Sequence, residues 1–251
     1  MKKHENKVAV ITGGNSGIGY GIAGELLAEG AKVVITGRSQ KAVEEAEKTL
    51  GPNATGIVAN QSILTDLSEL ADNVKKQFGH VDILVINAGV MHMAPIEGVS
   101  EEHFDEIMDI NFKGAFFTLQ KFLPLLGSGS SVIFILALSA TQGTQNRSVY
   151  SASKAALKSL ARVAAIELAP KGIRVNAISP GPFSTPIFEK SGAPVDALAK
   201  FADTISQKVL LKRYGQPSEV GKLVSFLSSE EASFITGGDY LIDGGMSINF
   251  S

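Results

Sequence analysis

The clearest indication of the fold is the stretch Lys7-Val-Ala-Val-Ile-Thr-Gly-Gly-Asn-Ser-Gly-Ile-Gly19, in which an apolar run leads directly into a cluster of glycines. It predicts a buried strand over Lys7–Ile11 and a helix over residues 17–29. In the turn between them, backbone N–H groups and the helix N-terminus can approach a phosphate group, because no Cβ atom stands in the way. The spacing is not GxGxxG, and a turn without a ligand is the alternative. The strand before it and the helix after it favour a dinucleotide pyrophosphate.

The same order of strand and helix recurs along the chain. Six further apolar runs are predicted strands: Lys32–Thr36, Thr55–Ala59, Asp82–Ile86, Ser131–Leu138, Arg174–Ile178 and Asp239–Ile242. Helices are expected near residues 40–50, 65–78, 101–125, 149–169 and 217–228. Because most of the apolar runs are continuous rather than alternating, the strands should be covered on both faces. The pattern predicts an α/β fold with a parallel, doubly wound sheet in a single domain over residues 1–251.

The composition excludes several classes of function. The 251 residues include no cysteine, which rules out disulfides, Cys-ligated zinc and thiol catalysis. The formal net charge of −2 leaves no polycationic face for nucleic acid. The four histidines lack metal-ligand spacing, so no metal site is expected. The longest apolar run, Val132–Leu138, is far shorter than the ~20 residues of a membrane helix. With no targeting signal in the sequence, we expect a cytoplasmic protein without a membrane partner.

The end of the second predicted strand indicates which dinucleotide fits. An NAD site usually carries Asp or Glu there, which accepts hydrogen bonds from the ribose hydroxyls. This chain has Thr36-Gly-Arg-Ser39 instead. Arg38 can pair bidentately with a 2′-phosphate, and Ser39 can add a donor. An ordinary solvated arginine is the alternative, but the missing acid favours NADP(H) over NAD(H).

A tyrosine and a lysine are placed for acid–base chemistry near the start of the helix predicted over 149–169. Tyr150 and Lys154 are four residues apart, so their side chains lie on one helix face. A nearby ammonium favours tyrosinate and so lowers the tyrosine pKa from about 10 toward the working range of a general acid. This spacing occurs by chance in many helices, so its meaning depends on the other motifs.

Further motifs appear in a fixed order with these: Asn87-Ala-Gly89, Asn111, Pro180-Gly181 and Asp243-Gly-Gly245. From about residue 7 to 245 the chain resembles the short-chain dehydrogenase/reductase family. The resemblance implies a Rossmann-type fold with a seven-stranded parallel sheet, usually in a homotetramer, and NAD(P)-linked interconversion of alcohols and carbonyl compounds. It implies that Tyr150 donates the proton to the carbonyl oxygen, that Lys154 binds the nicotinamide ribose and lowers the tyrosine pKa, and that Asn111 holds a water in the proton relay.

The cofactor-binding residues expected from the glycine turn and from the family pattern are Gly13, Asn15, Ser16, Gly17, Ile18, Gly19, Arg38, Ser39, Asn60, Asn87, Ala88, Gly89, Tyr150, Lys154, Pro180, Gly181 and Thr185. Asn60-Gln61 departs from that pattern, which commonly has Asp and then an apolar residue. The Asp carboxylate would accept from the adenine amino group, and the amide oxygen of Asn60 can still accept. An ordinary turn asparagine is the alternative.

The family pattern also places a serine thirteen residues before the tyrosine, where it hydrogen-bonds the substrate oxygen. This chain has Ala137 at that position, and Gly143 keeps the usual register. Ser139 could substitute, because residues i and i+2 share a face of an extended chain, although it would lie about 6.6 Å further along. Losing one such donor typically costs on the order of 10²–10³ in rate. We therefore expect an impaired NADPH-dependent carbonyl reductase or alcohol dehydrogenase. The alternative is a weak or inactive NADP(H)-binding protein that acts as a sensor or partner subunit.

The irregular stretch from residue 180 to 214 is expected to form a lid or a binding loop. A surface insertion without function is the alternative. Beside Ala137 and Ser139, the candidate pocket residues are His92, by analogy with the family, and Phe183. Ile187, Phe188 and Phe201 are expected either in an apolar lid or in a subunit contact, and a small carbonyl or alcohol substrate is implied.

Overall fold

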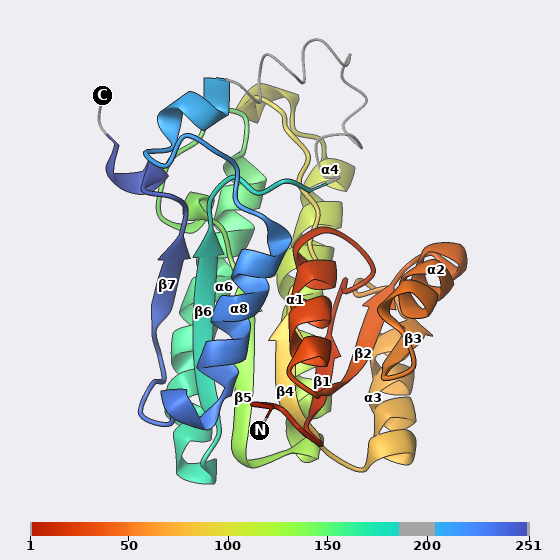
Figure 1. Cartoon of the computed structure of the whole chain (residues 1–251). Coiled ribbons are helices and arrows are strands. Elements are labelled where there is room, and N and C mark those ends of the chain that lie inside the picture. The colour runs from red at the N-terminus through yellow and green to blue at the C-terminus, as the bar shows by residue number, and fades with distance from the viewer. Residues whose placement is uncertain (1, 186–203, 250–251) are drawn as a thin grey trace.

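A computed structural model of the chain describes residues 2–185 and 204–249. Its centre is a seven-stranded sheet in the order β3-β2-β1-β4-β5-β6-β7 (Figure 1). Every neighbouring pair of these strands is parallel. The strands are β1 (Val8–Ile11), β2 (Lys32–Gly37), β3 (Ala54–Val58), β4 (Val81–Ile86), β5 (Leu126–Ile135), β6 (Arg174–Pro180) and β7 (Asp239–Ile242). The predicted fold class, a Rossmann-type α/β fold, is confirmed.

The helices cover both faces of the sheet. They are α1 (Gly17–Ala28), α2 (Gln40–Leu50), α3 (Leu64–Phe78), α4 (Glu101–Met108), α5 (Gly114–Phe122), α6 (Ser148–Leu168) and α8 (Pro217–Ser228). One core packs α1, α2 and α8 against the sheet, and the other packs α3, α5 and α6 (Figure 1). Alternate residues of β1 divide between the two cores: Ala9 and Ile11 belong to the first and Val10 to the second. This division explains why the strand sequences are continuously apolar.

The order of the strands reverses between β1 and β4. The chain runs from β1 outward to β3 and then returns to β4 on the other side of β1. Ligands of such sheets bind in the crevice beyond the carboxyl ends of the strands at this reversal. The loops that follow β1 and β4 therefore define the place where the functional residues should be sought.

Two predicted elements differ from those observed. The helix expected over 101–125 is divided into α4, a π-helical turn (Asp109–Lys113), α5 and a 3₁₀ turn (Leu123–Leu125). The strand expected over Ser131–Leu138 begins at Leu126 and ends at Ile135, because a 3₁₀ turn forms at Leu138–Ala140. An apolar run alone does not distinguish a strand from a buried turn that continues it.

Within residues 2–185 and 204–249, the helices all lack the length or the apolar character needed to cross a membrane. In the same part of the chain, no three His, Cys, Asp or Glu side chains gather as ligands of a metal ion would.

Candidate active site

The glycine-rich turn joins β1 to α1 at the reversal of strand order. Gly13 and Gly17 have φ angles of +64° and +55°, in the left-handed region that favours glycine. Gly19 lies against the carbonyl oxygen of Gly13 and the side-chain amide of Asn87, so a Cβ atom there would overlap both. Ser16 is the N-cap of α1, and Ile18 lies in its first turn. The backbone is therefore folded tightly, with the start of α1 facing the crevice.

The loop after β4 is tied to this turn by four hydrogen bonds. Asn87 Nδ2 donates to the main-chain oxygens of Thr12 (2.9 Å) and Gly13 (3.2 Å). The Thr12 hydroxyl accepts from the main-chain N–H groups of Asn87 and Ala88, both at 3.0 Å. Asn87-Ala-Gly89 is thus held directly against the glycine-rich turn.

Arg38 and Ser39 stand where β2 ends. Arg38 is exposed, and its guanidinium has no hydrogen-bond or ion-pair partner within the described chain. Asn15 packs against Gly37 at the end of this strand. A Cβ atom on residue 37 would lie only 2.6 Å from Asn15 Oδ1. Ser39 caps α2 by accepting from Ala42 N at 3.4 Å. The Ser39 hydroxyl still has its proton to donate.

Asn60 and Gln61 follow β3. The amide oxygen of Asn60 accepts from the N–H (3.2 Å) and the hydroxyl (3.0 Å) of Ser62, as in an ordinary turn asparagine. Both lone pairs of the expected adenine acceptor are therefore in use. Gln61 is buried, and its Nε2 donates to the carbonyl oxygens of Ile110 (3.1 Å) and Ala88 (3.4 Å). Gln61 therefore connects the end of β3 to the loop after β4. The difference from the family pattern at this position does not by itself predict that contact.

The three expected catalytic residues meet beside Gly89. Lys154 is buried in α6, and its Nζ lies 5.9 Å from the centre of the Tyr150 ring. A Cβ atom on Gly89 would lie 3.1 Å from Asn111 Oδ1 and 3.5 Å from Lys154 Nζ. Gly89 therefore lets the loop after β4 pack closely against both side chains.

Asn111 is held in the π-helical turn between α4 and α5. Its Nδ2 donates to Val90 O (2.9 Å) and Ser153 Oγ (3.1 Å), and its Oδ1 accepts from Val90 N (2.8 Å). A π-helical turn inside a helix is frequent at functional sites. Asn111 fixes the loop after Gly89 to the helix that carries Tyr150 and Lys154.

Burial shifts the pKa values of both Tyr150 and Lys154. It raises the pKa of Tyr150 to about 12, an effect that the positive charge of Arg147 opposes only in part. Burial also lowers the pKa of Lys154 to about 8. The lowering of the tyrosine pKa expected from Lys154 is therefore not found, because the cost of desolvating tyrosinate is the larger effect. The cation that acts on Tyr150 is Arg147, a residue that no motif in the sequence singles out.

Ala137 and Ser139 do not share a strand face. Ala137 is extended, with φ −165° and ψ 163°, and it precedes the 3₁₀ turn that contains the buried Ser139. The alternation of an extended chain does not apply inside this turn, so the premise for substituting Ser139 is wrong. Ala137 follows the end of β5, where the serine of the family pattern is expected.

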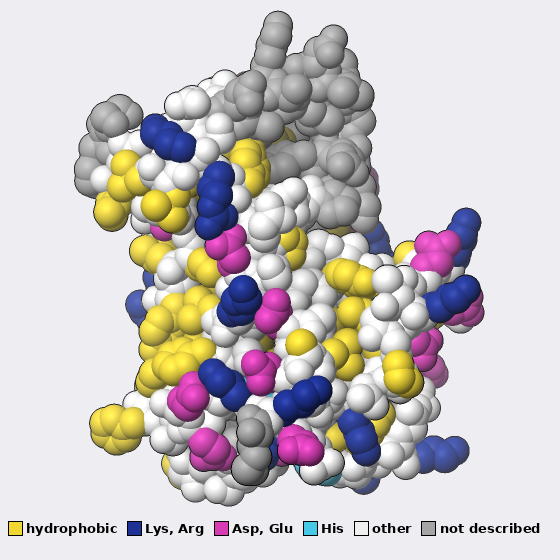
Figure 2. Space-filling model, viewed as in Figure 1, with side chains coloured by type: hydrophobic (Ala, Val, Ile, Leu, Met, Phe, Trp, Pro, Cys, Tyr) yellow, Lys and Arg dark blue, Asp and Glu magenta, His cyan; other side chains and the backbone are white. Residues whose placement is uncertain are grey.

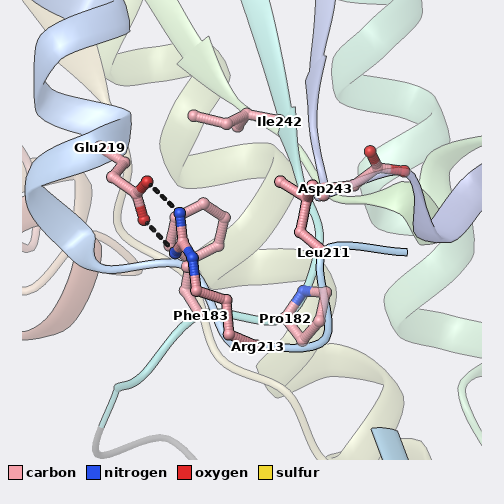
Figure 3. A pocket seen from close by; sticks show the side chains of 9 residues that line it. Pro182, Phe183, Leu211, Arg213, Glu219, Ile242 and Asp243 are labelled. Carbon is pink, nitrogen blue, oxygen red and sulfur yellow. Dashed lines mark hydrogen bonds and ion pairs between the residues drawn. The ribbon is translucent and has the colours of Figure 1, made fainter. Parts of the chain in front are cut away.

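His92 and Phe183, two of the candidate pocket residues, lie in different surroundings. His92 Nε2 lies 3.2 Å from Glu106 Oε2, and its ring meets that of His103 edge-on, so His92 faces the exposed side of α4. Phe183 is buried after β6 and lines a cavity of about 90 Å³ with Pro182, Leu211, Arg213, Gly215, Glu219, Ile242, Asp243 and Gly244 (Figure 3). That lining contains neither Tyr150 nor Lys154. The Arg213–Glu219 ion pair closes one side of this cavity.

The stretch predicted to be irregular over residues 180–214 begins one residue later than expected, because β6 continues to Pro180. Pro180 is the last residue of β6, and Gly181 N donates to Ile242 O at 2.9 Å. A Cβ on Gly181 would lie 2.7 Å from Asp243 Cα, so the two motifs Pro180-Gly181 and Asp243-Gly-Gly245 are in contact. Thr185 is the last residue before the part of the segment outside the described residues, which contains Ile187, Phe188 and Phe201.

Known proteins resemble this chain over nearly all its length. The family described as enoyl-(acyl carrier protein) reductase matches residues 13–247. An oxidoreductase of Sarocladium schorii is 40% identical over 248 residues, which cover 98% of this chain and 98% of that protein.

Two crystal structures of Brucella melitensis proteins share the fold. One, described as a short-chain dehydrogenase/reductase (glucose/ribitol dehydrogenase), has a TM-score of 0.91 and 34% identity over 98% of this chain and 99% of its own. The other, a 3-ketoacyl-(acyl-carrier-protein) reductase complexed with NADH, has a TM-score of 0.89 and 32% identity over 97% of this chain and 99% of its own. Together with the order of the motifs and the geometry of the crevice, these matches show that the chain belongs to the short-chain dehydrogenase/reductase family of oxidoreductases.

Proposed function

We propose that this chain is an NADPH-dependent carbonyl reductase, which also catalyses the reverse alcohol oxidation. The observation that carries the proposal is the meeting of Tyr150, Lys154 and Asn111 beside Gly89, at the reversal of strand order. These side chains come from α6 and from the π-helical turn, and they converge where a parallel sheet of this kind binds its ligand.

The residues around the crevice fit a dinucleotide. The tight turn at Gly13 and Gly17 and the start of α1 offer N–H groups to a pyrophosphate. Arg38, exposed and unpaired among the described residues, suits the 2′-phosphate that distinguishes NADP(H). When bound, the reduced nicotinamide supplies a hydride to the carbonyl carbon.

Tyr150 holds the proton that the substrate oxygen receives. With its pKa raised to about 12, the hydroxyl stays protonated at neutral pH, which favours its role as a donor and hence the reductive direction. Lys154 lies close to the ring, and its pKa of about 8 allows it to carry or release a proton near neutral pH. Asn111 positions Tyr150 and Lys154 through its hydrogen bonds to Val90 and to Ser153, which lies between them in α6.

Ala137 limits the expected rate. Its methyl group has no donor for the substrate oxygen, and one missing donor at such a position costs on the order of 10²–10³ in rate. This observation also favours a second candidate function, an NADP(H)-binding protein with little or no turnover. The two candidates differ in catalysis and not in cofactor binding.

A turnover assay separates these functions. NADPH oxidation would be measured with a panel of ketones and aldehydes for the wild type, Tyr150→Phe and Tyr240→Phe, the last being a matched control in β7. We expect measurable reduction that Tyr150→Phe lowers at least a hundredfold and Tyr240→Phe leaves unchanged. Binding of NADPH without reduction of any compound would favour the second candidate.

We expect a homotetramer, as is usual in the family. Exposed apolar side chains gather over α8 and β7, on the left of the view in Figure 2, and include Phe226 and Leu241. Phe234 lies between these elements in the chain and is fully exposed. An apolar surface of this kind supports an interface between subunits. Analytical ultracentrifugation of the wild type and of Leu241→Lys tests it, with dissociation of the variant as the expected result.

A further inference from the structure

Arg147 occupies a fixed position one helical turn before Tyr150. It is the N-cap residue of α6, its main-chain oxygen accepts from Ser151 N at 2.8 Å, and its N–H donates to Thr144 O at 3.3 Å. An isolated β-bridge pairs it with Ala94, in the segment that follows Asn87-Ala-Gly89. The backbone of Arg147 is therefore held between the loop after β4 and the helix that carries the proton donor.

The guanidinium of Arg147 is unpaired. Its Nε is buried without a hydrogen-bond partner, and the described residues contribute no ion pair to it. Two other arginines behave differently: Arg174 donates to the carbonyl oxygens of Leu227, Ser229 and Ile235, and Arg213 pairs with both oxygens of Glu219. A buried donor atom without a partner is unusual in a folded protein, and an ion or water bound there is one of its accepted explanations.

Arg147 lies three residues before Tyr150, at the start of the helix that carries Tyr150 and Lys154. At this distance along the helix its positive charge opposes in part the rise that burial causes in the pKa of Tyr150. The acid on the neighbouring helix, Glu106, lies against His92 instead. A positive charge without a counter-ion thus stands beside the group that protonates the substrate.

We propose that Arg147 binds an anionic group of the substrate, so that the preferred carbonyl compounds are oxo acids with a carboxylate near the carbonyl. This inference rests on the proposed function. The cofactor phosphates do not account for Arg147, because the glycine turn after β1 and Arg38 after β2 serve them on the other side of β4. The planar guanidinium fork matches a carboxylate bidentately.

The experiment compares matched substrates. An oxo acid and its methyl ester would be reduced by the wild type, Arg147→Lys, Arg147→Met and Arg162→Met, the last being the same change at an exposed arginine of α6. We expect the wild type to prefer the acid at least tenfold in kcat/KM. Arg147→Met should lose this preference because the KM for the acid rises and the KM for the ester does not, whereas a change in kcat through Tyr150 would affect both substrates alike. Arg147→Lys should retain part of the preference. Arg162→Met should behave as the wild type.

A binding measurement keeps the inference testable without turnover. Calorimetric titration of the NADP⁺ complex with the non-reactive carboxylate analogue of the acid should show binding that Arg147→Met weakens at least tenfold and Arg162→Met does not change. Such binding without reduction of any oxo acid would refute the proposed function and leave the anion site standing. Equal use of acid and ester by the wild type, or carboxylate binding unchanged in Arg147→Met, overturns the anion site. Stronger Arg147-dependent binding of a phosphate ester than of the carboxylate would overturn the choice of carboxylate.

Discussion

Lys154 donates a hydrogen bond from its Nζ to the main-chain oxygen of Ile135, at 2.9 Å. This bond ties α6 to the last residue of β5, two residues before Ala137. It orients the lysine toward the crevice and satisfies one of its three donors in a site where the side chain is only 3% exposed. The position of the lysine is therefore set by the sheet as well as by its own helix.

The burial of Lys154 predicts a stability that rises with pH. Its folded-state pKa is about 8 and its ordinary value is 10.5, so between these values the unfolded chain binds more protons than the folded one. The free energy of unfolding should rise by about 2 kcal/mol between pH 7 and pH 9.5. Urea unfolding at the two pH values measures it, and Lys154→Met should abolish most of the rise. An equal rise in that variant would contradict the assignment.

Tyr150 predicts the opposite trend at higher pH. Its pKa is raised from 10.0 to about 12, so between these values the unfolded chain loses a proton that the folded chain keeps. The free energy of unfolding should therefore fall as the pH rises from about 10 to about 12. Comparison of wild type with Tyr150→Phe isolates this contribution, and the variant should show the shallower fall.

Gly19 and Gly24 offer a matched test of the glycine turn. A Cβ at Gly19 would overlap Gly13 O and Asn87 Nδ2, whereas a Cβ at Gly24 in the same helix would meet nothing within 4 Å. Gly19→Ala should weaken NADPH binding at least tenfold and destabilise the fold by more than about 1 kcal/mol. Gly24→Ala should bind NADPH normally and gain up to about 1 kcal/mol, since alanine favours helix. Calorimetric titration and thermal unfolding measure both, and normal NADPH affinity in Gly19→Ala would count against the turn as a phosphate site.

Ala137→Ser should restore the hydroxyl donor that the family pattern places after β5. We expect carbonyl reduction to increase at least tenfold, with little change in NADPH affinity. Ser139→Ala should stay within about threefold of the wild-type rate, because Ser139 lies in the 3₁₀ turn and not on the strand face of Ala137. Steady-state kinetics with one ketone compares the variants. A loss of activity in Ser139→Ala, with no gain in Ala137→Ser, would assign the donor role to Ser139.

Arg38→Met should change the choice of cofactor. Loss of the charge-assisted pair with a 2′-phosphate should raise the KM for NADPH on the order of tenfold to a hundredfold. The KM for NADH should change less than about twofold, because NADH has no phosphate at this position. Lys41→Met, at an exposed residue one helical turn further along, serves as the control. A wild-type preference for NADH would refute the role of Arg38.

Local patterns in the sequence are sufficient to predict most of the strands and helices. Continuous apolar runs predicted strands buried on both faces, and the glycine turn after Lys7–Ile11 predicted where β1 passes into α1. Glycine conformation and side-chain periodicity are properties of neighbouring residues, so they can be read without knowing what packs against them. The same signals placed β5 too far along the chain, because the end of a strand depends on the pairing of its neighbour.

The candidate site combines residues that are distant in the sequence, so its contacts cannot be predicted from local patterns. Tyr150 and Lys154 were recognised from their spacing, and Asn111 and Gly89 from the family pattern, but their contacts arise only when α6, the π-helical turn and the loop after β4 converge. Sequence spacing suggested that Lys154 lowers the tyrosine pKa, and the folded chain reverses the direction. Desolvation depends on every element that covers a group, and the sequence near that group does not contain this information.

Arg147 illustrates the same division. In the sequence it is one cation in a loop before a helix, with nothing to distinguish it from an exposed residue. Folding buries its Nε without a partner and places its charge beside Tyr150. The order of strands, helices and glycine turns thus follows from local chemistry along the chain. The pKa values of Tyr150 and Lys154, and the absence of a partner for Arg147 Nε, follow from tertiary packing. Packing alone removes water from these groups and decides which charges face each other.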